Sequence, residues 1–259
     1  MLYVVSTPIG NLSDITFRAI EILKSCDLIL CEDTRHSLTL LNHYEIKRPL
    51  QSLHQHNEKK AITPLIERLQ NGETFCLISD AGTPLLSDPG FPLIQACIEN
   101  NIPLTALPGP CALIDALVCS GLPTHPFQFL GFLPQKRTDL CKTVSTLLEY
   151  PGTSICYASP HRIIETLDLF EQMEPNRQAC LARELTKKFE TFHRGTLKEL
   201  AAEARATAPR GELVLLVKQG EKKFSEKYPS PLEFALQLET IFKIQKKDAI
   251  KIAAELCEH

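Results

Sequence analysis

The chain has 259 residues, of which 44% are hydrophobic and 23% charged, as in an ordinary globular protein of one or two domains. It contains no apolar run near the roughly 18 residues that a membrane-spanning helix needs, and no basic-then-apolar signal peptide. Its ten cysteines lie mostly in apolar runs and form no C-x-x-C pair. This pattern argues against a disulfide framework and against a zinc site, and it predicts small buried residues in a reducing cytoplasm.

The net charge of −3 is unevenly distributed along the chain. Residues 1–120 carry 8 basic against 13 acidic side chains, whereas residues 183–223 carry 10 basic against 6 acidic ones. A basic segment on a mildly acidic protein indicates a face that meets an anionic partner, although an ordinary solvated helix face gives the same pattern.

Short apolar segments alternate with amphipathic ones over the first 120 residues. The predicted strands are residues 2–5, 27–31, 49–54, 75–78 and 103–107. The predicted helices are one that starts at Asp14 or Thr16, one capped by Asn57 that runs to residue 69, and residues 91–100 and 113–120. This alternation predicts a mostly parallel sheet with helices on both faces.

The loop of residues 77–90, LISDAGTPLLSDPG, lies between a predicted strand and a predicted helix. That order places it at the carboxyl edge of the sheet, where open α/β sheets bind ligands. Gly82 permits a positive φ and a close approach to the backbone, and Asp80 offers a fixed acceptor. A tight structural turn explains one such loop equally well, but three further loops repeat the pattern.

The alternation breaks near residues 121–126, which predicts a first domain of residues 1–120 and a second of residues 121–220. The strands expected in the second domain are residues 127–132, 153–157, 178–183, 189–194 and 213–217. Its helices are residues 138–149, a helix with Ser159 as N-cap and Pro160 at the first helical position, and residues 197–206. A polar linker, residues 218–231, precedes two amphipathic helices within a 231–259 extension, which we expect to pack on each other or on the body.

The loops STPIGNLSDIT, CEDTRHS, SDAGTPLLSDPG and LPGPCA, followed by GFLP, SPHR and ARELTKKFE, resemble the tetrapyrrole methylase superfamily of S-adenosylmethionine-dependent methyltransferases over residues 1–220. They look like the branch that methylates the ribose 2′-hydroxyl of a cytidine in the decoding region of 16S ribosomal RNA. Tetrapyrrole enzymes usually carry a G-D-P loop where this chain has Ser79 to Gly82. The chain departs from its branch at Cys111, where serine is common, at Ser6, where glycine is common, and in a shorter tail.

The resemblance implies an α/β fold of two αβα domains, the class III S-adenosylmethionine methyltransferase fold, with a short C-terminal helical extension. It implies a cofactor folded up between the domains, no metal, and a cytoplasmic homodimer. A dinucleotide-type G-x-G-x-x-G motif does not follow the first strand. The residues expected to bind the cofactor are Pro8, Ile9, Asp80, Ala81, Gly82, Thr83, Pro110, Cys111, Ala112, Leu133, Ala158 and Ser159. For Ile9 and Leu12, packing within the loop is an equal alternative.

A ribose hydroxyl is a poor nucleophile at neutral pH, so a base or a nearby cation would assist its methylation. The candidates for catalysis all follow predicted strands: Arg35, Arg162, Glu184 and Lys187, with Glu32 and Asp33 nearby. Lys187 or Arg162 would hold phosphate, and Glu184 would orient a cation or accept the proton. The alternative is a structural ion-pair network that includes Glu32, Arg35 and Glu184.

Two other functions remain open at this point. A tetrapyrrole or precorrin C-methyltransferase would share the fold but needs no basic segment. A non-catalytic ribosome-binding factor would have a blocked cofactor slot, whereas Gly82, Gly109 and Ala112 are all small. The resemblance implies 16S ribosomal RNA in the small ribosomal subunit as the partner.

Overall fold

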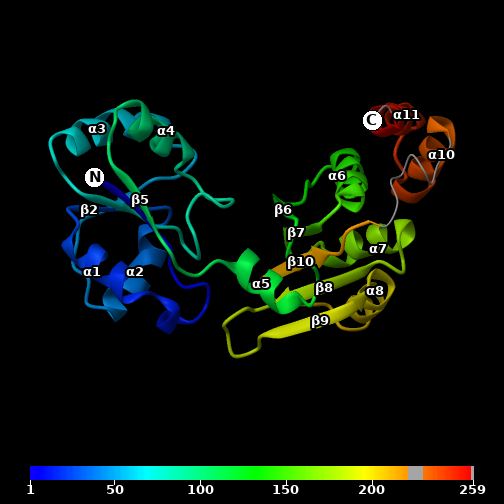
Figure 1. Ribbon diagram of the computed structural model, residues 1–259, viewed down its shortest axis with the longest axis horizontal. Helices are drawn as coiled ribbons and strands as arrows, with labels where there is room; N and C mark the ends of the chain where they lie inside the picture. Colours follow the sequence, from blue (N-terminus) through cyan, green and yellow to red (C-terminus); the bar gives the residue numbers. More distant parts are fainter. Residues whose placement is uncertain (221–229, 258–259) are drawn as a thin grey trace. The chain divides into compact units, whose positions relative to one another are not determined.

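A computed structural model describes residues 1–220 and 230–257 (Figure 1). The chain folds into two compact units, Met1–Ala112 and Leu113–His259. Most of the linker predicted at residues 218–231 lies outside the described residues. Within the described ranges, no helix has the length and apolar character needed to cross a membrane, and no group of three or more His, Cys, Asp or Glu side chains is arranged to hold a metal ion.

The first unit contains a five-stranded parallel sheet of order β3-β2-β4-β1-β5. Its strands are β1 (Leu2–Val5), β2 (Leu28–Cys31), β3 (Leu50–Ser52), β4 (Phe75–Leu77) and β5 (Leu104–Leu107). Helices α1 (Phe17–Ser25) and α2 (Thr34–His43) share a buried core with one face, and α3 (Glu58–Gln70) and α4 (Phe91–Glu99) with the other. The predicted parallel sheet with helices on both faces is confirmed.

Capping side chains mark the starts of α1 and α2 in this unit. Thr16, one of the two predicted caps, accepts a hydrogen bond from Ala19 N at the start of α1. Asn57 precedes α3 as predicted. Its side-chain Oδ1 accepts from His54 N and does not cap the helix, so the predicted capping role is wrong. Helix α2 was not predicted; Asp33 caps it by accepting from Arg35 N.

The strand order creates a switch point between β1 and β4. These strands are neighbours, yet the helix after β1 belongs to the core on one face of the sheet and the helix after β4 to the core on the other. Their connections therefore diverge at the carboxyl edge, and open α/β sheets bind ligands where neighbouring connections diverge in this way.

The second unit contains a mixed sheet of order β6-β7-β10-β8-β9. Its strands are β6 (Phe127–Phe132), β7 (Thr153–Ala158), β8 (Gln178–Arg183), β9 (Thr191–Thr196) and β10 (Leu213–Val217). Only β6 and β7 are parallel to each other, because β10 is antiparallel to both of its neighbours and β8 and β9 form an antiparallel pair. Helices α6 (Arg137–Glu149), α7 (Ile163–Met173) and α8 (Leu197–Ala206) share a core with one face.

Helix α5 (Ala112–Ser120) belongs almost entirely to the second unit, whereas the sequence predicts a boundary after residue 120. The guanidinium of Arg194 on β9 donates to the carbonyl oxygens of Cys119, at 2.6 Å, and Ser120, at 3.2 Å. Helix α5 also buries Leu113 and Leu117. These contacts are long-range, so composition near residue 121 did not reveal them.

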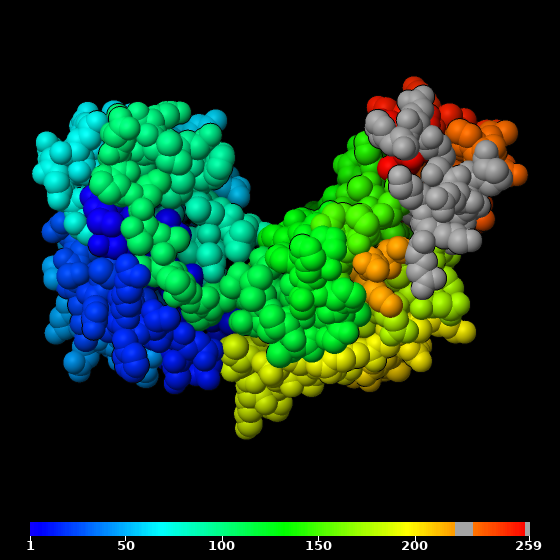
Figure 2. Space-filling view, in the orientation of Figure 1, coloured from blue at the N-terminus to red at the C-terminus, as the bar shows by residue number. Residues whose placement is uncertain are grey.

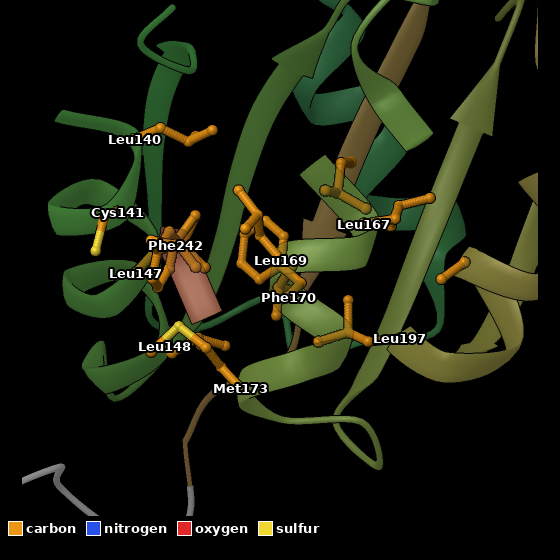
Figure 3. Close-up of a cluster of buried hydrophobic side chains, with 14 of the residues drawn as sticks. Leu140, Cys141, Leu147, Leu148, Leu167, Leu169, Phe170, Met173, Leu197 and Phe242 are labelled. Atoms are coloured by element: carbon orange, nitrogen blue, oxygen red, sulfur yellow. The ribbon is translucent and has the colours of Figure 1, made fainter. Parts of the chain in front are cut away.

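The C-terminal helices α10 (Pro231–Phe242) and α11 (Lys246–Cys257) pack on each other and on α6, which confirms that prediction. Phe234, Leu238 and Phe242 of α10 are fully buried in the core that α6, α7 and α8 share. Figure 3 shows Phe242 beside Leu147 of α6, and in Figure 2 the orange and red helices lie next to green α6. The extension is thus part of the core of the second unit.

Candidate functional site

The loops that follow β1 and β4 are joined to each other by hydrogen bonds. Thr7 and Gly82 exchange two backbone hydrogen bonds, of 2.9 and 3.0 Å. The Thr7 hydroxyl donates to the Ser79 carbonyl at 3.1 Å, and the Ser79 hydroxyl donates to the Gly82 carbonyl at 3.0 Å. The loop containing Asp80 and Gly82 is therefore fixed against the loop containing Pro8 and Ile9.

The loop after β5 joins the same group. Thr83 Oγ1 donates to the Pro110 carbonyl at 3.0 Å and lies 3.0 Å from Ser6 Oγ. A Cβ on Gly109 would lie 2.8 Å from Ser6 Cβ, so only glycine permits this approach. The structure thus brings together three of the predicted cofactor-binding stretches: Pro8 and Ile9, Asp80 to Thr83, and Pro110 to Ala112.

Gly82 adopts a φ of 80°, in the left-handed region that glycine permits. A Cβ at this position would lie 3.2 Å from Ile9 Cγ2. Ile9 is buried against this glycine, and Leu12 packs on the core shared by α1 and α2. Leu12 therefore packs against the protein core, as one of the two alternatives predicted. Ile9 packs directly against Gly82.

Acidic side chains gather near the same edge of the sheet. Asp80 Oδ1 accepts from Asp33 N at 3.3 Å, which links the loops after β4 and β2. Burial raises the pKa of Asp88 to about 6, and the negative charges of Glu32 and Asp80 add to the effect. Asp88 was not among the predicted site residues. Because burial is the main cause, the Asp88 carboxyl group is protonated more easily than a solvent-exposed aspartate.

Arg35, predicted to be catalytic, is paired within the first turn of α2. Its Nη2 lies 2.8 Å from Asp33 Oδ2, and its side chain is 89% exposed. Hydrogen bonds from the Arg35 guanidinium and backbone lower the pKa of Asp33 to about 2. The pair keeps both groups charged and is open to solvent.

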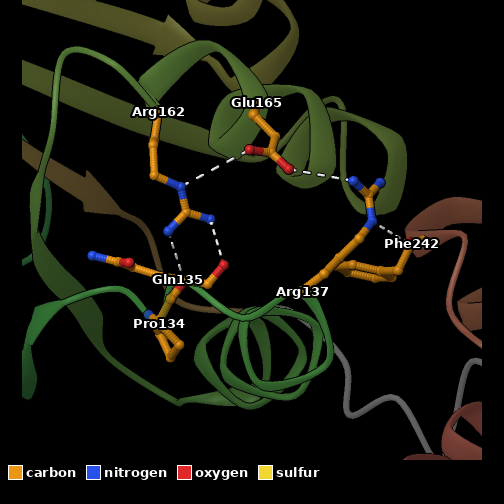
Figure 4. Close-up of polar contacts among 6 residues, drawn as sticks. All are labelled: Pro134, Gln135, Arg137, Arg162, Glu165 and Phe242. Carbon is orange, nitrogen blue, oxygen red and sulfur yellow. Dashed lines mark hydrogen bonds and ion pairs between the residues drawn. The ribbon is translucent and has the colours of Figure 1, made fainter.

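Arg162 of the second unit connects the loop after β6 to the start of α7 (Figure 4). Its guanidinium donates to the carbonyl oxygens of Pro134 and Gln135, both at 3.1 Å, and lies 3.9 Å from Glu165. Helix α7 begins at Ile163, not at Pro160 as predicted.

The predicted cofactor residues of this unit lie beside that connection. The Ser159 hydroxyl accepts from His161 N at 3.3 Å, so Ser159 closes a turn that precedes α7 instead of capping the helix. Ala158 ends β7, and Leu133, which follows β6, packs on the core of the unit.

Glu184 and Lys187 lie in the turn between β8 and β9, where Glu184 and Thr186 have positive φ values of 51° and 63°. Lys187 Nζ lies 3.1 Å from Glu184 Oε1 and 3.0 Å from Glu212 Oε2. Burial opposes the charge of Lys187, but hydrogen bonds to Glu212 and Glu184 outweigh it and raise the lysine pKa. Hydrogen bonding from Glu212 N lowers the pKa of Glu184. The turn therefore holds an ionised lysine between two carboxylates.

These pairings bear on the alternative of a structural ion network. Arg35 pairs with Asp33, and Glu184 pairs with Lys187, each within its own unit. Each of the four predicted catalytic residues thus belongs to a local ion pair. Glu212, which the sequence did not reveal, also pairs with Lys187. Glu212 is 28 residues from Glu184, and no local pattern links them.

Comparisons with known proteins agree with this architecture. The family model for tetrapyrrole (corrin/porphyrin) methylases matches residues 1–201. A crystal structure of diphthine synthase superposes with a TM-score of 0.63 at 14% identity, over 87% of this chain and 93% of the other. A Thermus thermophilus uroporphyrin-III C-methyltransferase complexed with S-adenyl homocysteine superposes with a TM-score of 0.58 at 17% identity, over 85% and 97%. The fold is that of the tetrapyrrole methylase class.

Sequence comparison narrows the class. A ribosomal RNA small subunit methyltransferase I from Hydrogenobaculum sp. is 49% identical over 87% of this chain and 98% of its own length. The protein of that name from Escherichia coli O157:H7 is 43% identical over 98% and 88%. The chain belongs to the tetrapyrrole methylase family and, within it, to the ribosomal RNA small subunit methyltransferase I group.

Proposed function

We propose that this protein transfers a methyl group from S-adenosylmethionine to the ribose 2′-hydroxyl of a cytidine in the decoding region of 16S ribosomal RNA, within the small ribosomal subunit. The observation that carries the proposal is the hydrogen-bonded group of three loops at the β1–β4 switch point. It is supported by the 43–49% identity of this chain to two relatives named ribosomal RNA small subunit methyltransferase I. We also propose that it acts in the cytoplasm as a homodimer.

The residues of the first unit fit a sulfonium cofactor. S-adenosylmethionine carries a sulfonium and an ammonium group, and the partly buried carboxyl groups of Glu32, Asp80 and Asp88 offer negative charge that a cation would offset. Glycines at positions 82 and 109 let the loop backbones approach closely, and hydrogen bonds between Thr7 and Gly82 hold these loops in place for a ligand. We propose that Asp80 to Thr83 and Pro110 to Ala112 hold it.

Bound S-adenosylmethionine would supply an electrophilic methyl group, and positioning of the ribose hydroxyl would supply most of the rate. Glu184 is a poor candidate for the base, because its pKa is lowered and its Oε1 already accepts from Lys187 Nζ and Glu212 N. We propose instead that Glu184 positions Lys187, and that the charged ammonium of Lys187 stabilises the attacking oxygen.

Arg162 and Arg35 have more limited roles in this proposal. Arg162 already donates to two carbonyl groups, so we propose that it positions the loop after β6 instead of binding phosphate. Arg35 is exposed, and we propose that it meets the RNA from the first turn of α2. Leu133, Ala158 and Ser159 remain predicted cofactor contacts.

The test is a methyl-transfer assay with tritiated S-adenosylmethionine on two substrates, small ribosomal subunits that lack the modification and uroporphyrinogen III. We expect label in 16S ribosomal RNA only, and mapping of 2′-O-methyl groups should place it on one cytidine. Label in the tetrapyrrole alone would establish the other activity of the family. Absence of S-adenosylmethionine binding by calorimetry would favour a non-catalytic ribosome-binding factor.

A further inference from the structure

The second unit has a pocket of about 580 Å³ between α8 and the β8–β9 pair. In the register of the two strands Leu181 faces His193 and Arg183 faces Thr191, and all four line the pocket. The side toward α8 is closed by Leu200 and by Ala206 at the end of that helix. None of these residues belongs to the loops assigned above to the cofactor.

The lining combines an apolar floor with two cations. Leu181 and Leu200 are buried and supply the floor. Arg183 and Arg210 line the same pocket, and the Nε of Arg183 donates to the Arg210 carbonyl at 2.6 Å, which ties the two residues together. Among the described residues, neither guanidinium forms an ion pair with a carboxylate. Lys187, in contrast, is neutralised by two carboxylates.

Two polar groups in the pocket lack a complete set of partners. The Thr191 hydroxyl is shielded from solvent and has no hydrogen-bond partner among the described residues. His193 Nδ1 lies 2.7 Å from Glu203 Oε1. Because a carboxylate only accepts, the proton of this bond is on Nδ1, and Nε2 of the imidazole is left for another partner.

We propose that this pocket binds a nucleotide of the RNA substrate other than the one that is methylated. An apolar floor suits a base, two guanidinium groups suit its phosphate, and Thr191 with His193 can bond the base edge or the ribose 2′-hydroxyl. The volume lies within the range of about 300–1,000 Å³ that is usual for small-ligand sites. The positive charge of Arg183 and Arg210 favours RNA, which is anionic, over a lipid tail or a peptide without acidic residues. This inference rests on the proposed function and names a second contact between the protein and its substrate.

Two alanines on α8 provide a matched pair for the test. Ala206 lines the pocket, whereas Ala202 lies on the same helix outside it, and both are exposed. Ala206→Trp should fill the pocket and weaken binding of unmodified small ribosomal subunits about tenfold, as expected for loss of a stacked base. Ala202→Trp should bind like the parent protein. Affinity for S-adenosylmethionine should be unchanged in both variants.

A second variant separates ligand binding from folding. Thr191→Val removes the hydroxyl without changing the side-chain shape, and because that hydroxyl has no partner in the free protein, the melting temperature should stay the same or rise. Its affinity for the ribosomal subunit should nevertheless fall about threefold to tenfold. Arg210→Ala should weaken binding and reduce the slope of log K against log salt by about 1.

These experiments distinguish failure of the pocket proposal from failure of the proposed function. If the parent protein methylates 16S ribosomal RNA and Ala206→Trp binds the subunit as tightly as Ala202→Trp does, the pocket proposal is wrong and the proposed function stands. If the parent neither binds nor methylates the subunit, both are wrong. A rise in KM with unchanged kcat for Ala206→Trp and Thr191→Val would support a substrate contact distant from the reacting atoms.

Discussion

Replacement of Gly82 tests whether the three-loop group binds the cofactor. At a φ of 80° an alanine incurs about 1–2 kcal/mol of left-handed backbone strain. Its Cβ would lie 3.2 Å from Ile9 Cγ2, so the Ile9 loop must also shift by a few tenths of an ångström. Gly82→Ala should thus lower the free energy of unfolding by about 1–2 kcal/mol and displace the loop containing Ile9. Gly82→Val adds two methyl groups and should cost about 3–4 kcal/mol.

Gly72 provides the control for strain alone. Its φ is 93°, and a Cβ there would meet no atom within 4 Å. Gly72→Ala should therefore lose a similar amount of stability with no effect on binding. Urea denaturation gives the stability of each variant, and titration calorimetry gives its affinity for S-adenosylmethionine. We expect about a tenfold loss of affinity for Gly82→Ala and complete loss for Gly82→Val. Equal affinities of Gly82→Ala and Gly72→Ala would refute the assignment of this loop to the cofactor.

Three further predictions concern other parts of the molecule. Burial and nearby carboxylates raise the pKa of Asp88 from 3.8 to about 6, so its contribution to stability is full below about pH 4 and is lost as the pH rises through 6. Asp88→Asn should therefore raise the free energy of unfolding at pH 8 by about 1–2 kcal/mol, after allowance for solvent screening. At pH 4 it should leave the free energy of unfolding unchanged, and equal gains at both pH values would contradict the explanation. Lys187→Ala should leave S-adenosylmethionine affinity unchanged and lower kcat for RNA methylation, because it removes the ammonium group proposed to stabilise the attacking oxygen; a calorimetric titration showing lost cofactor binding would count against it. Phe242→Ala should destabilise the second unit by about 3–5 kcal/mol in chemical denaturation, since this ring is fully buried, and a loss below 1 kcal/mol would show that α10 is only appended to the unit.

The sequence by itself determined most of the helices and strands, and it predicts a ligand site at the carboxyl edge of the first sheet. Strands β1, β6, β8 and β10 have the predicted bounds because their apolar runs are bordered by turn residues. Helix α8 also has its predicted bounds, since Thr196 and Glu199 form a reciprocal capping box at its start. These are local signals, carried by residues within a few positions of one another.

Tertiary structure alone decided which of those local elements meet. The order β3-β2-β4-β1-β5 places Thr7 against Gly82, 75 residues later, and no periodicity in either loop specifies that pairing. The same holds for Glu212, which neutralises Lys187, and for α5, which joins the second unit through Arg194. Hydrophobic periodicity and helix capping depend on residues that are neighbours along the chain. Strand order and ion pairing between distant residues depend instead on which faces of the helices and sheets pack together when the protein folds.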